Sequence, residues 1–181
     1  KGQSKGTLVK ALRAPIKRNH RRYGGLLVHL GIILLSIGII GIEGLQQEKQ
    51  TNLAIGDSTQ LGGYSFIFEE LNEFGDEEGR IITEAKLSFE REGKAAGTLH
   101  PRRVIYPMMN LAVTEPGLQS NLARDLYVIL VDWQLTSLDV ATFNIFYNPL
   151  VSWLWVGTAV LTVGSVIAIL PGELKTKKNA G

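Results

Sequence analysis

Two long uncharged hydrophobic runs divide the 181-residue chain into three parts. The first run, residues 24–42, has 19 residues, and the second, residues 149–171, has 23. An α-helix rises about 1.5 Å per residue, so the shorter run reaches about 28 Å, close to the thickness of a bilayer core. The alternative is a buried core helix, but cores of soluble proteins rarely need so many consecutive uncharged residues. We therefore expect two transmembrane helices.

Between the two runs, the pattern changes to the two-residue alternation of half-buried β-strands. Residues 84–90 alternate strictly between apolar and polar side chains. Residues 64–68 and 126–131 are stronger strand candidates, and 126–131 is apolar on both faces, which favours a central position. Residues 140–147 predict a last strand that leads directly into the second run. About seven short strands in roughly 100 residues predict a small antiparallel sandwich or barrel.

Polar clusters between these strands predict their connections. Residues 91–94, Arg-Glu-Gly-Lys, are a candidate hairpin turn between strands at 81–90 and 95–106. Residues 76–79 are a more exposed loop. The expected fold class is therefore a membrane protein of α plus β type, with two transmembrane helices flanking an antiparallel β-rich extracytoplasmic domain.

The net charge of +2 is the balance of three charged segments of opposite sign and of Glu43, which adds −1. Residues 1–22 carry +8, residues 45–148 carry −7 and residues 171–181 carry +2. Lys and Arg accumulate on the cytoplasmic side of membrane proteins, so we expect an inner-membrane, multi-pass protein with both ends cytoplasmic. The expected parts are a cytoplasmic basic segment at 1–22, a transmembrane helix at 23–44, a periplasmic β-domain at 45–147, a transmembrane helix at 148–171 and a cytoplasmic basic tail at 172–181.

A cleaved signal peptide is the competing interpretation of the first run. The run is longer than a typical signal-peptide core, and no Ala-x-Ala cleavage site follows it, so we expect an anchor. Aromatic residues at the start of the second run predict an interfacial belt. These residues are Phe143, Phe146, Tyr147, Trp153 and Trp155.

Several classes of function are excluded by composition and motif content. The chain has no cysteine, which excludes a disulfide framework, a zinc ribbon, an iron–sulfur site and a cysteine nucleophile. The charge balance excludes a highly basic nucleic-acid binder. No Walker loop, dinucleotide-type glycine fingerprint or HExxH motif is present. We assign no catalytic residue.

Three polar pairs in the predicted β-domain are weaker candidates. Arg102 and Arg103 would suit an anionic partner, although basic pairs on edge strands are usually surface residues. The pairs at 114–115, Thr-Glu, and 124–125, Arg-Asp, suit structural ion pairs or hydrogen-bond anchors. The dispersed acidic residues are more typical of a solvated face than of a paired catalytic site.

His29 is the strongest candidate for a functional side chain. It lies seven residues after Arg22, about 10 Å into the membrane from the cytoplasmic side. An ionisable side chain at that depth is costly and normally points into a helix bundle or cavity. Imidazole is a common axial ligand of heme iron, while the alternative is a neutral histidine that hydrogen-bonds to a neighbouring helix.

Glycines recur every seven residues on both runs and predict close helix packing. In the first run, Gly24, Gly31 and Gly38 form one stripe, and His29 lies on nearly the opposite side. In the second run the same spacing is found at residues 157 and 164. Neighbours on both sides of the first helix predict a bundle of more than two helices.

Three segments in the same order resemble the CcmF-type cytochrome c heme lyase family. They are RRYGG with VHLG (residues 21–31), TE with RDLYV (residues 114–128), and YNPLVSWLWVG (residues 147–157). The nitrite-reductase-type heme lyase subunit shares these features. The resemblance implies that the chain is the C-terminal portion of an integral membrane heme lyase that attaches heme to apocytochrome c.

The resemblance also implies a cofactor and partners. His29 matches the histidine that is one of two membrane ligands of a b-type heme in that family, which implies a role as axial ligand to the heme iron. That heme is thought to reduce the incoming heme iron. The implied partners are the upstream helices of the lyase, a periplasmic heme chaperone, apocytochrome c, the thiol-handling maturation subunits and membrane lipid.

Other parts of the family pattern are absent from this sequence. The tryptophan-rich WWD loop, its flanking histidines and the second membrane histidine have no counterpart, and neither His20 nor His100 matches one. We therefore expect a fragment or one subunit of a split protein, without lyase activity on its own. The alternative function is a cofactor-free membrane-tethered adaptor whose periplasmic β-domain docks partner proteins.

Overall fold

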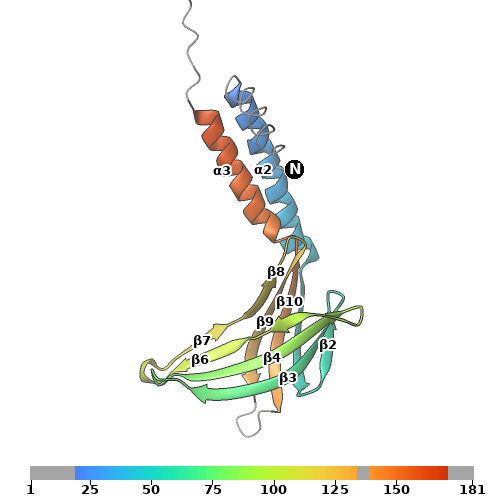
Figure 1. Ribbon diagram of the computed structural model, residues 1–181, viewed down its shortest axis with the longest axis vertical. Helices are drawn as coiled ribbons and strands as arrows, with labels where there is room; N and C mark the ends of the chain where they lie inside the picture. Colours follow the sequence, from blue (N-terminus) through green and yellow to red (C-terminus); the bar gives the residue numbers. More distant parts are fainter. Residues whose placement is uncertain (1–18, 134–138, 171–181) are drawn as a thin grey trace, which may run out of the picture. The chain divides into compact units, whose positions relative to one another are not determined.

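The computed structural model describes residues 19–133 and 139–170 (Figure 1). These residues divide into a helical unit, 19–39 with 153–170, and a β unit, 40–152. Two helices, α2 (His20–Leu45) and α3 (Ser152–Ile169), precede and follow the strands in the chain. Both are long and apolar enough to cross a membrane, with mean hydropathies of 2.5 and 1.7.

Glycines allow α2 and α3 to approach each other closely. Gly24 lies against Ala168 and Gly38 lies against Leu154, so the two helices are antiparallel. Gly157 and Gly164 of α3 face the backbone of α2 in the same way. A β-carbon on any of these glycines would be 2.6–2.8 Å from a backbone nitrogen of the other helix. The predicted glycine packing is therefore confirmed.

The β unit consists of two antiparallel sheets that pack face to face (Figure 1). The first sheet has the strand order β1-β10-β9-β8, and the second has the order β2-β3-β4-β6-β7, with β5 also paired to β4. The strands are β1 (Gln47–Ala54), β2 (Ser58–Leu61), β3 (Tyr64–Gly75), β4 (Ile81–Arg91), β5 (Lys94–Leu99), β6 (Arg102–Tyr106), β7 (Leu111–Glu115), β8 (Gly117–Ser120), β9 (Arg124–Trp133) and β10 (Val140–Pro149), and a short 3₁₀ helix, η1 (Pro107–Met109), joins β6 to β7.

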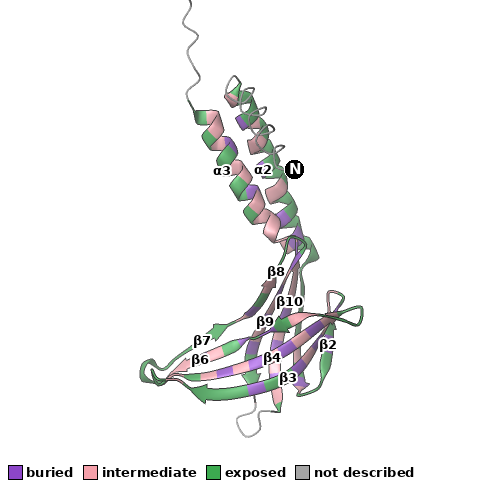
Figure 2. Cartoon of the chain, in the orientation of Figure 1, coloured by how far each residue is buried: buried purple, intermediate pink, exposed green. Residues whose placement is uncertain are grey.

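The core lies between the two sheets, where alternate side chains of the long strands are buried (Figure 2). Phe68 of β3 meets Phe143 of β10 edge to face, with ring centroids 5.0 Å apart, and this contact joins the two sheets. The predicted alternation of residues 84–90 is confirmed, because Ala85, Leu87 and Phe89 are all fully buried. The antiparallel β-sandwich expected from the sequence is therefore present.

The strand predicted at 126–131 is central in its sheet, as we expected because it is apolar on both faces. It forms most of β9, which lies between β10 and β8. Its outward-facing Tyr127 contacts Phe146 of β10, with ring centroids 5.7 Å apart. The estimate of about seven strands is too low, since the described residues contain ten. The short strands β2, β7 and β8 lack a clear hydrophobic alternation.

The predicted turn at residues 91–94 is confirmed as a two-residue hairpin. Arg91 pairs with Lys94, and the intervening Glu92 and Gly93 have φ angles of 53° and 71°. Positive φ at both central residues is typical of the tight turns that match the twist of a hairpin.

The predicted aromatic belt is partly wrong. Phe143 is fully buried in the sandwich core, and Tyr147 packs against the same core. The alternation of β10 explains this, because residues 141, 143 and 145 all face inward. Trp155 on α3 is 75% exposed and remains a candidate for a membrane interface.

Candidate functional site

His29 lies on the face of α2 that points away from α3. Its ring is exposed, while Gly24 and Gly31 on the opposite side of the helix are buried against α3. A substituent on Gly25, one turn before His29, would meet nothing within 4 Å. The predicted separation of the glycine stripe from His29 is therefore confirmed.

The imidazole of His29 is oriented by its own helix. Its Nδ1 lies 2.7 Å from the carbonyl oxygen of Gly25, and a carbonyl only accepts hydrogen bonds. Nδ1 therefore carries the proton, and in the neutral ring Nε2 presents its lone pair. In the described part of the chain, no group hydrogen-bonds to Nε2. This is the state in which a histidine is ready to bind a metal ion through Nε2.

Three hydroxyl side chains in the two helices are satisfied locally. Ser36, Thr158 and Thr162 each donate a hydrogen bond to the carbonyl oxygen four residues earlier, at 2.8–3.0 Å. Such bonds satisfy hydroxyl groups in an apolar environment. His29 differs from these side chains in offering a free imidazole nitrogen lone pair, which is a far better ligand for iron than a hydroxyl oxygen.

The other histidines do not combine with His29. His20 is the first residue of α2, and His100, between β5 and β6, lies 3.3 Å from Glu84. Within residues 19–133 and 139–170, no group of three or more His, Asp or Glu side chains is arranged to hold a metal ion. A metal or heme iron bound at His29 would therefore need a ligand from elsewhere.

A buried polar cluster closes one end of the sandwich. Arg124, at the start of β9, donates to the Tyr64 hydroxyl oxygen at 2.8 Å and to the Gln119 side-chain oxygen at 3.2 Å. Its guanidinium also lies 4.5 Å from the centre of the Tyr64 ring. Arg91 donates to the same hydroxyl at 3.3 Å. The prediction of a hydrogen-bond anchor at residues 124–125 is thus confirmed for Arg124.

These arginines change the acidity of Tyr64. Burial by itself raises the pKa of a phenol, but the hydrogen bonds from Arg124 and Arg91 outweigh burial, and the pKa of Tyr64 is lowered. The sequence pointed to Arg124 but not to Tyr64 or Gln119. The available signal was the two-residue alternation of the strand. Arg124 lies two residues before the inward-facing Leu126 and therefore faces inward as well.

The remaining predicted pairs lie on the surface. Arg102 binds Glu84, and Arg103 donates to the carbonyl oxygen of Val131 at 2.5 Å. Residues 114 and 115 lie on β7, where every residue is exposed. The contacts of Arg102 and Arg103 provide local structure.

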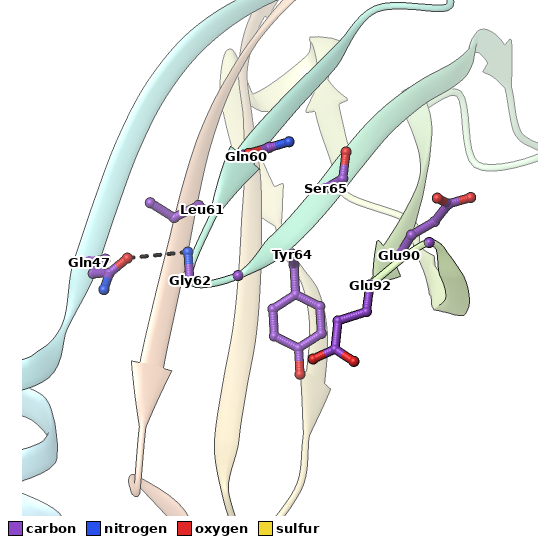
Figure 3. A pocket seen from close by; sticks show the side chains of 10 residues that line it. Gln47, Gln60, Leu61, Gly62, Tyr64, Ser65, Glu90 and Glu92 are labelled. Carbon is purple, nitrogen blue, oxygen red and sulfur yellow. Dashed lines mark hydrogen bonds between the residues drawn. The ribbon is translucent and has the colours of Figure 1, made fainter.

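An open pocket of about 580 Å³ lies beside the β2–β3 and β4–β5 turns (Figure 3). Glu90, Glu92 and the ring of Tyr64 contribute to its wall. The backbone nitrogen of Gly62 donates to the side-chain oxygen of Gln47 at 3.2 Å at its edge. The pocket brings no histidine or other candidate residue together, and we assign no chemistry to it.

Two apolar helices and an antiparallel β-sandwich define a class of membrane protein with a β-domain between two candidate spans. Residues 44–149, more than half of the chain, match the family described as the CcmF C-terminal beta-sandwich. The chain belongs to this family.

Known proteins similar to the chain are cytochrome c biogenesis proteins. The CcmF protein of Pseudomonas aeruginosa is 30% identical over 94% of this chain and 26% of its own length. The NrfE protein of Haemophilus influenzae is 28% identical over 87% of this chain and 24% of its own length. The chain thus spans about a quarter of the length of these relatives.

A solved structure has the same fold. The structure of the cytochrome c heme lyase CcmF superposes with a TM-score of 0.63 and 25% sequence identity. The superposition covers 86% of this chain and 26% of that protein. The resemblance inferred from the sequence motifs is therefore confirmed.

Proposed function

We propose that this chain is the C-terminal part of an inner-membrane heme lyase that attaches heme to apocytochrome c. Membership of the CcmF C-terminal family and similarity to proteins named for cytochrome c biogenesis support this function. The chain corresponds to about a quarter of those proteins, so the activity belongs to a larger assembly. Its proposed partners are the remaining lyase helices, a periplasmic heme chaperone, apocytochrome c and the thiol-handling subunits.

We further propose that His29 is one axial ligand of a b-type heme in the membrane. The observation that carries this proposal is the 2.7 Å hydrogen bond from Nδ1 to the Gly25 carbonyl, which leaves Nε2 free on the outward face of α2. Heme-ligating histidines commonly donate the other ring nitrogen to an oxygen acceptor in this way. A b-type heme bound there would supply a one-electron redox centre within the bilayer.

The packing of α2 explains why the heme would lie on that face. The Gly24–Gly31–Gly38 side is occupied by α3, whose backbone leaves no room for a cofactor. The His29 side is open within the described chain and offers Gly25 as a small neighbour. A second ligand would come from another helix of the assembly.

The proposed topology places the β-domain on the periplasmic side. The charges of +8 on residues 1–22 and +2 on residues 171–181 support cytoplasmic ends, and both helices are long enough to span. In this arrangement the proposed parts are 1–22, 23–44, 45–147, 148–171 and 172–181, and the helices that cross the membrane are α2 (His20–Leu45) and α3 (Ser152–Ile169).

The test is the heme content of the complete membrane assembly carrying His29→Ala. We expect loss of the b-type heme absorbance and of c-type cytochrome yield, because Nε2 is removed. His29→Gly supplied with free imidazole should recover part of the heme spectrum, which a purely structural defect would not do. The matched control is His100→Ala, whose ring contacts Glu84 in the β-domain and which should retain the heme. An unchanged spectrum and yield in His29→Ala would refute the ligand assignment.

A second candidate function is a cofactor-free adaptor whose β-domain docks partner proteins. The observation in its favour is the pair Met108 and Met109, which are 99% and 74% exposed between β6 and β7. Exposed apolar side chains of this kind often mark interaction surfaces. In that case the purified assembly would contain no heme, and His29→Ala would have no effect on cytochrome c yield.

A further inference from the structure

The β8–β9 turn lies at the end of the sandwich from which α3 continues. Strand β10 ends at Pro149, which pairs with Arg124, the first residue of β9. Helix α3 begins three residues after Pro149, at Ser152. The turn between Ser120 and Arg124 is therefore next to the last residues of the chain before α3.

Hydrogen bonds hold this turn to the start of α3. The backbone nitrogen of Leu150 donates to the carbonyl oxygen of Ala123 at 3.0 Å. The hydroxyl of Ser152 donates to the carbonyl oxygen of Asn121 at 2.8 Å. Leu150 has a φ of 64°, an unfavourable conformation for leucine that needs support from its surroundings. The two hydrogen bonds to the turn support this conformation of Leu150 and keep the turn next to Ser152.

The level of Ser152 relative to a bilayer follows from the length of α3. The helix has 18 residues, so it is about 27 Å long, barely the thickness of the hydrocarbon core. Neither end of such a short span can stand far outside the core. Tryptophan side chains favour the membrane interface, and two of them, Trp153 and Trp155, lie one and three residues after Ser152. Ser152 and the turn bonded to it would therefore lie at the membrane boundary.

The turn has the composition of a segment that enters this boundary. Leu122 at its tip is 63% exposed, and the residues 120–123 carry no charge. The side-chain oxygen of Asn121 accepts hydrogen bonds from the backbone nitrogens of Ala123 at 2.8 Å and Arg124 at 2.9 Å. Arg124, the nearest charged residue, is buried and turned to Tyr64. An uncharged tip with an exposed leucine and several paired backbone groups loses less on leaving water than a charged or fully unpaired turn would.

We propose that the β8–β9 turn is an interfacial anchor that inserts Leu122 into the periplasmic boundary of the lipid bilayer. The partner is lipid, and the anchor would hold this end of the sandwich at the membrane boundary. This inference rests on the proposed membrane crossing of α3.

The absence of cysteine from the chain permits a direct test. Leu122→Cys is labelled with an environment-sensitive fluorophore in the complete assembly, reconstituted in phosphatidylcholine vesicles. Quenching is measured with aqueous iodide and with brominated lipids. The matched control is Ile55→Cys, an exposed apolar residue, 43% exposed, at the far end of β1 and about 26 Å along that strand. Val163→Cys in α3 reports separately on the crossing itself.

We expect the label at position 122 to be quenched by brominated lipid and protected from iodide several-fold relative to position 55. Iodide access equal to that of position 55, with lipid quenching at position 163, would overturn the anchor and leave the crossing intact. Protection from both quenchers would also overturn it, because protein would then cover the turn. An absence of quenching by brominated lipid at position 163 would instead refute the membrane crossing of α3.

Discussion

Gly31 of α2 and Leu161 of α3 lie so close that a β-carbon on the glycine would be 2.7 Å from the backbone nitrogen of Leu161. No real β-carbon tolerates that distance to a backbone atom. The same relationship recurs seven residues away in each direction, at Gly24 and Gly38. The two helices therefore pack backbone to backbone, and their outer faces remain available for other partners.

Gly31→Ala should destabilise the helix pair, because the new methyl group has to push α3 away. Overpacking of this kind costs about 1–3 kcal/mol. The measurement is the midpoint of heat-induced unfolding in detergent. Gly44→Ala makes the same change in the same helix, where nothing lies within 4 Å, and should leave the midpoint unchanged or slightly raised. Equal midpoints for the two variants would contradict the packing.

Arg124→Met should weaken the sandwich, because it leaves the buried Tyr64 hydroxyl and the Gln119 amide without their shared donor. Loss of a buried charged partner costs about 2–4 kcal/mol. Hydrogen exchange of the β3 and β9 amides would measure the change in opening free energy. The control is Arg102→Met, whose side chain is 46% exposed beside Glu84 and whose loss should cost less than about 1 kcal/mol. Similar effects for both arginines would show that the cluster adds no stability.

The features that were predictable from sequence depend on short-range patterns. The strand at 84–90, the turn at 91–94 and the glycine stripe of α2 are each visible in the spacing of residues within one element. His29 was singled out because an ionisable residue in an apolar run is unusual. The structure adds the Gly25 hydrogen bond, which fixes the tautomer.

The features that were missed depend on contacts between distant residues. Tyr64 and Arg124 meet although they are 60 residues apart in the chain. Phe143 was assigned to the membrane interface because it lies near the second run, but strand pairing turns it towards Phe68. Local alternation indicates that Arg124 and Phe143 face inward, but it does not identify their partners, because that requires knowledge of which strands face each other.

The β3–β4 turn should become less stable in acid because of Asp76. Its side-chain oxygen accepts the backbone nitrogens of Arg80 at 2.9 Å and Glu78 at 3.0 Å, and its carboxylate also binds the Arg80 guanidinium. The backbone hydrogen bond from Arg80, with its side chain in support, lowers the pKa of Asp76 below the usual 3.8. A group with a lowered pKa stabilises the fold above pH 3.8 and loses that contribution as the pH falls through the lowered value.

Amide exchange of residues 76–80, measured from pH 5 to pH 2 and corrected for intrinsic rates, would detect this change. Exchange in the unmodified protein should rise towards the acid end. Asp76→Asn keeps the acceptor oxygen but removes the titrating charge, so it should exchange faster at pH 5 and depend less on pH. A variant with the same pH dependence as the unmodified protein would exclude Asp76 as the cause.

Met108→Ser combined with Met109→Ser should separate partner docking from heme binding. The two side chains are among the most exposed apolar groups of the β unit, at 99% and 74%, and neither belongs to the core. If the pair docks an exported partner, its replacement should leave the fold and the heme spectrum of the complete assembly intact while lowering c-type cytochrome yield several-fold, because flexible exposed apolar side chains supply such contacts. Ile55→Ser, which removes a 43% exposed apolar side chain elsewhere on the β unit, serves as the control. If the yield of the double variant equals that of Ile55→Ser, the methionine pair has no docking role.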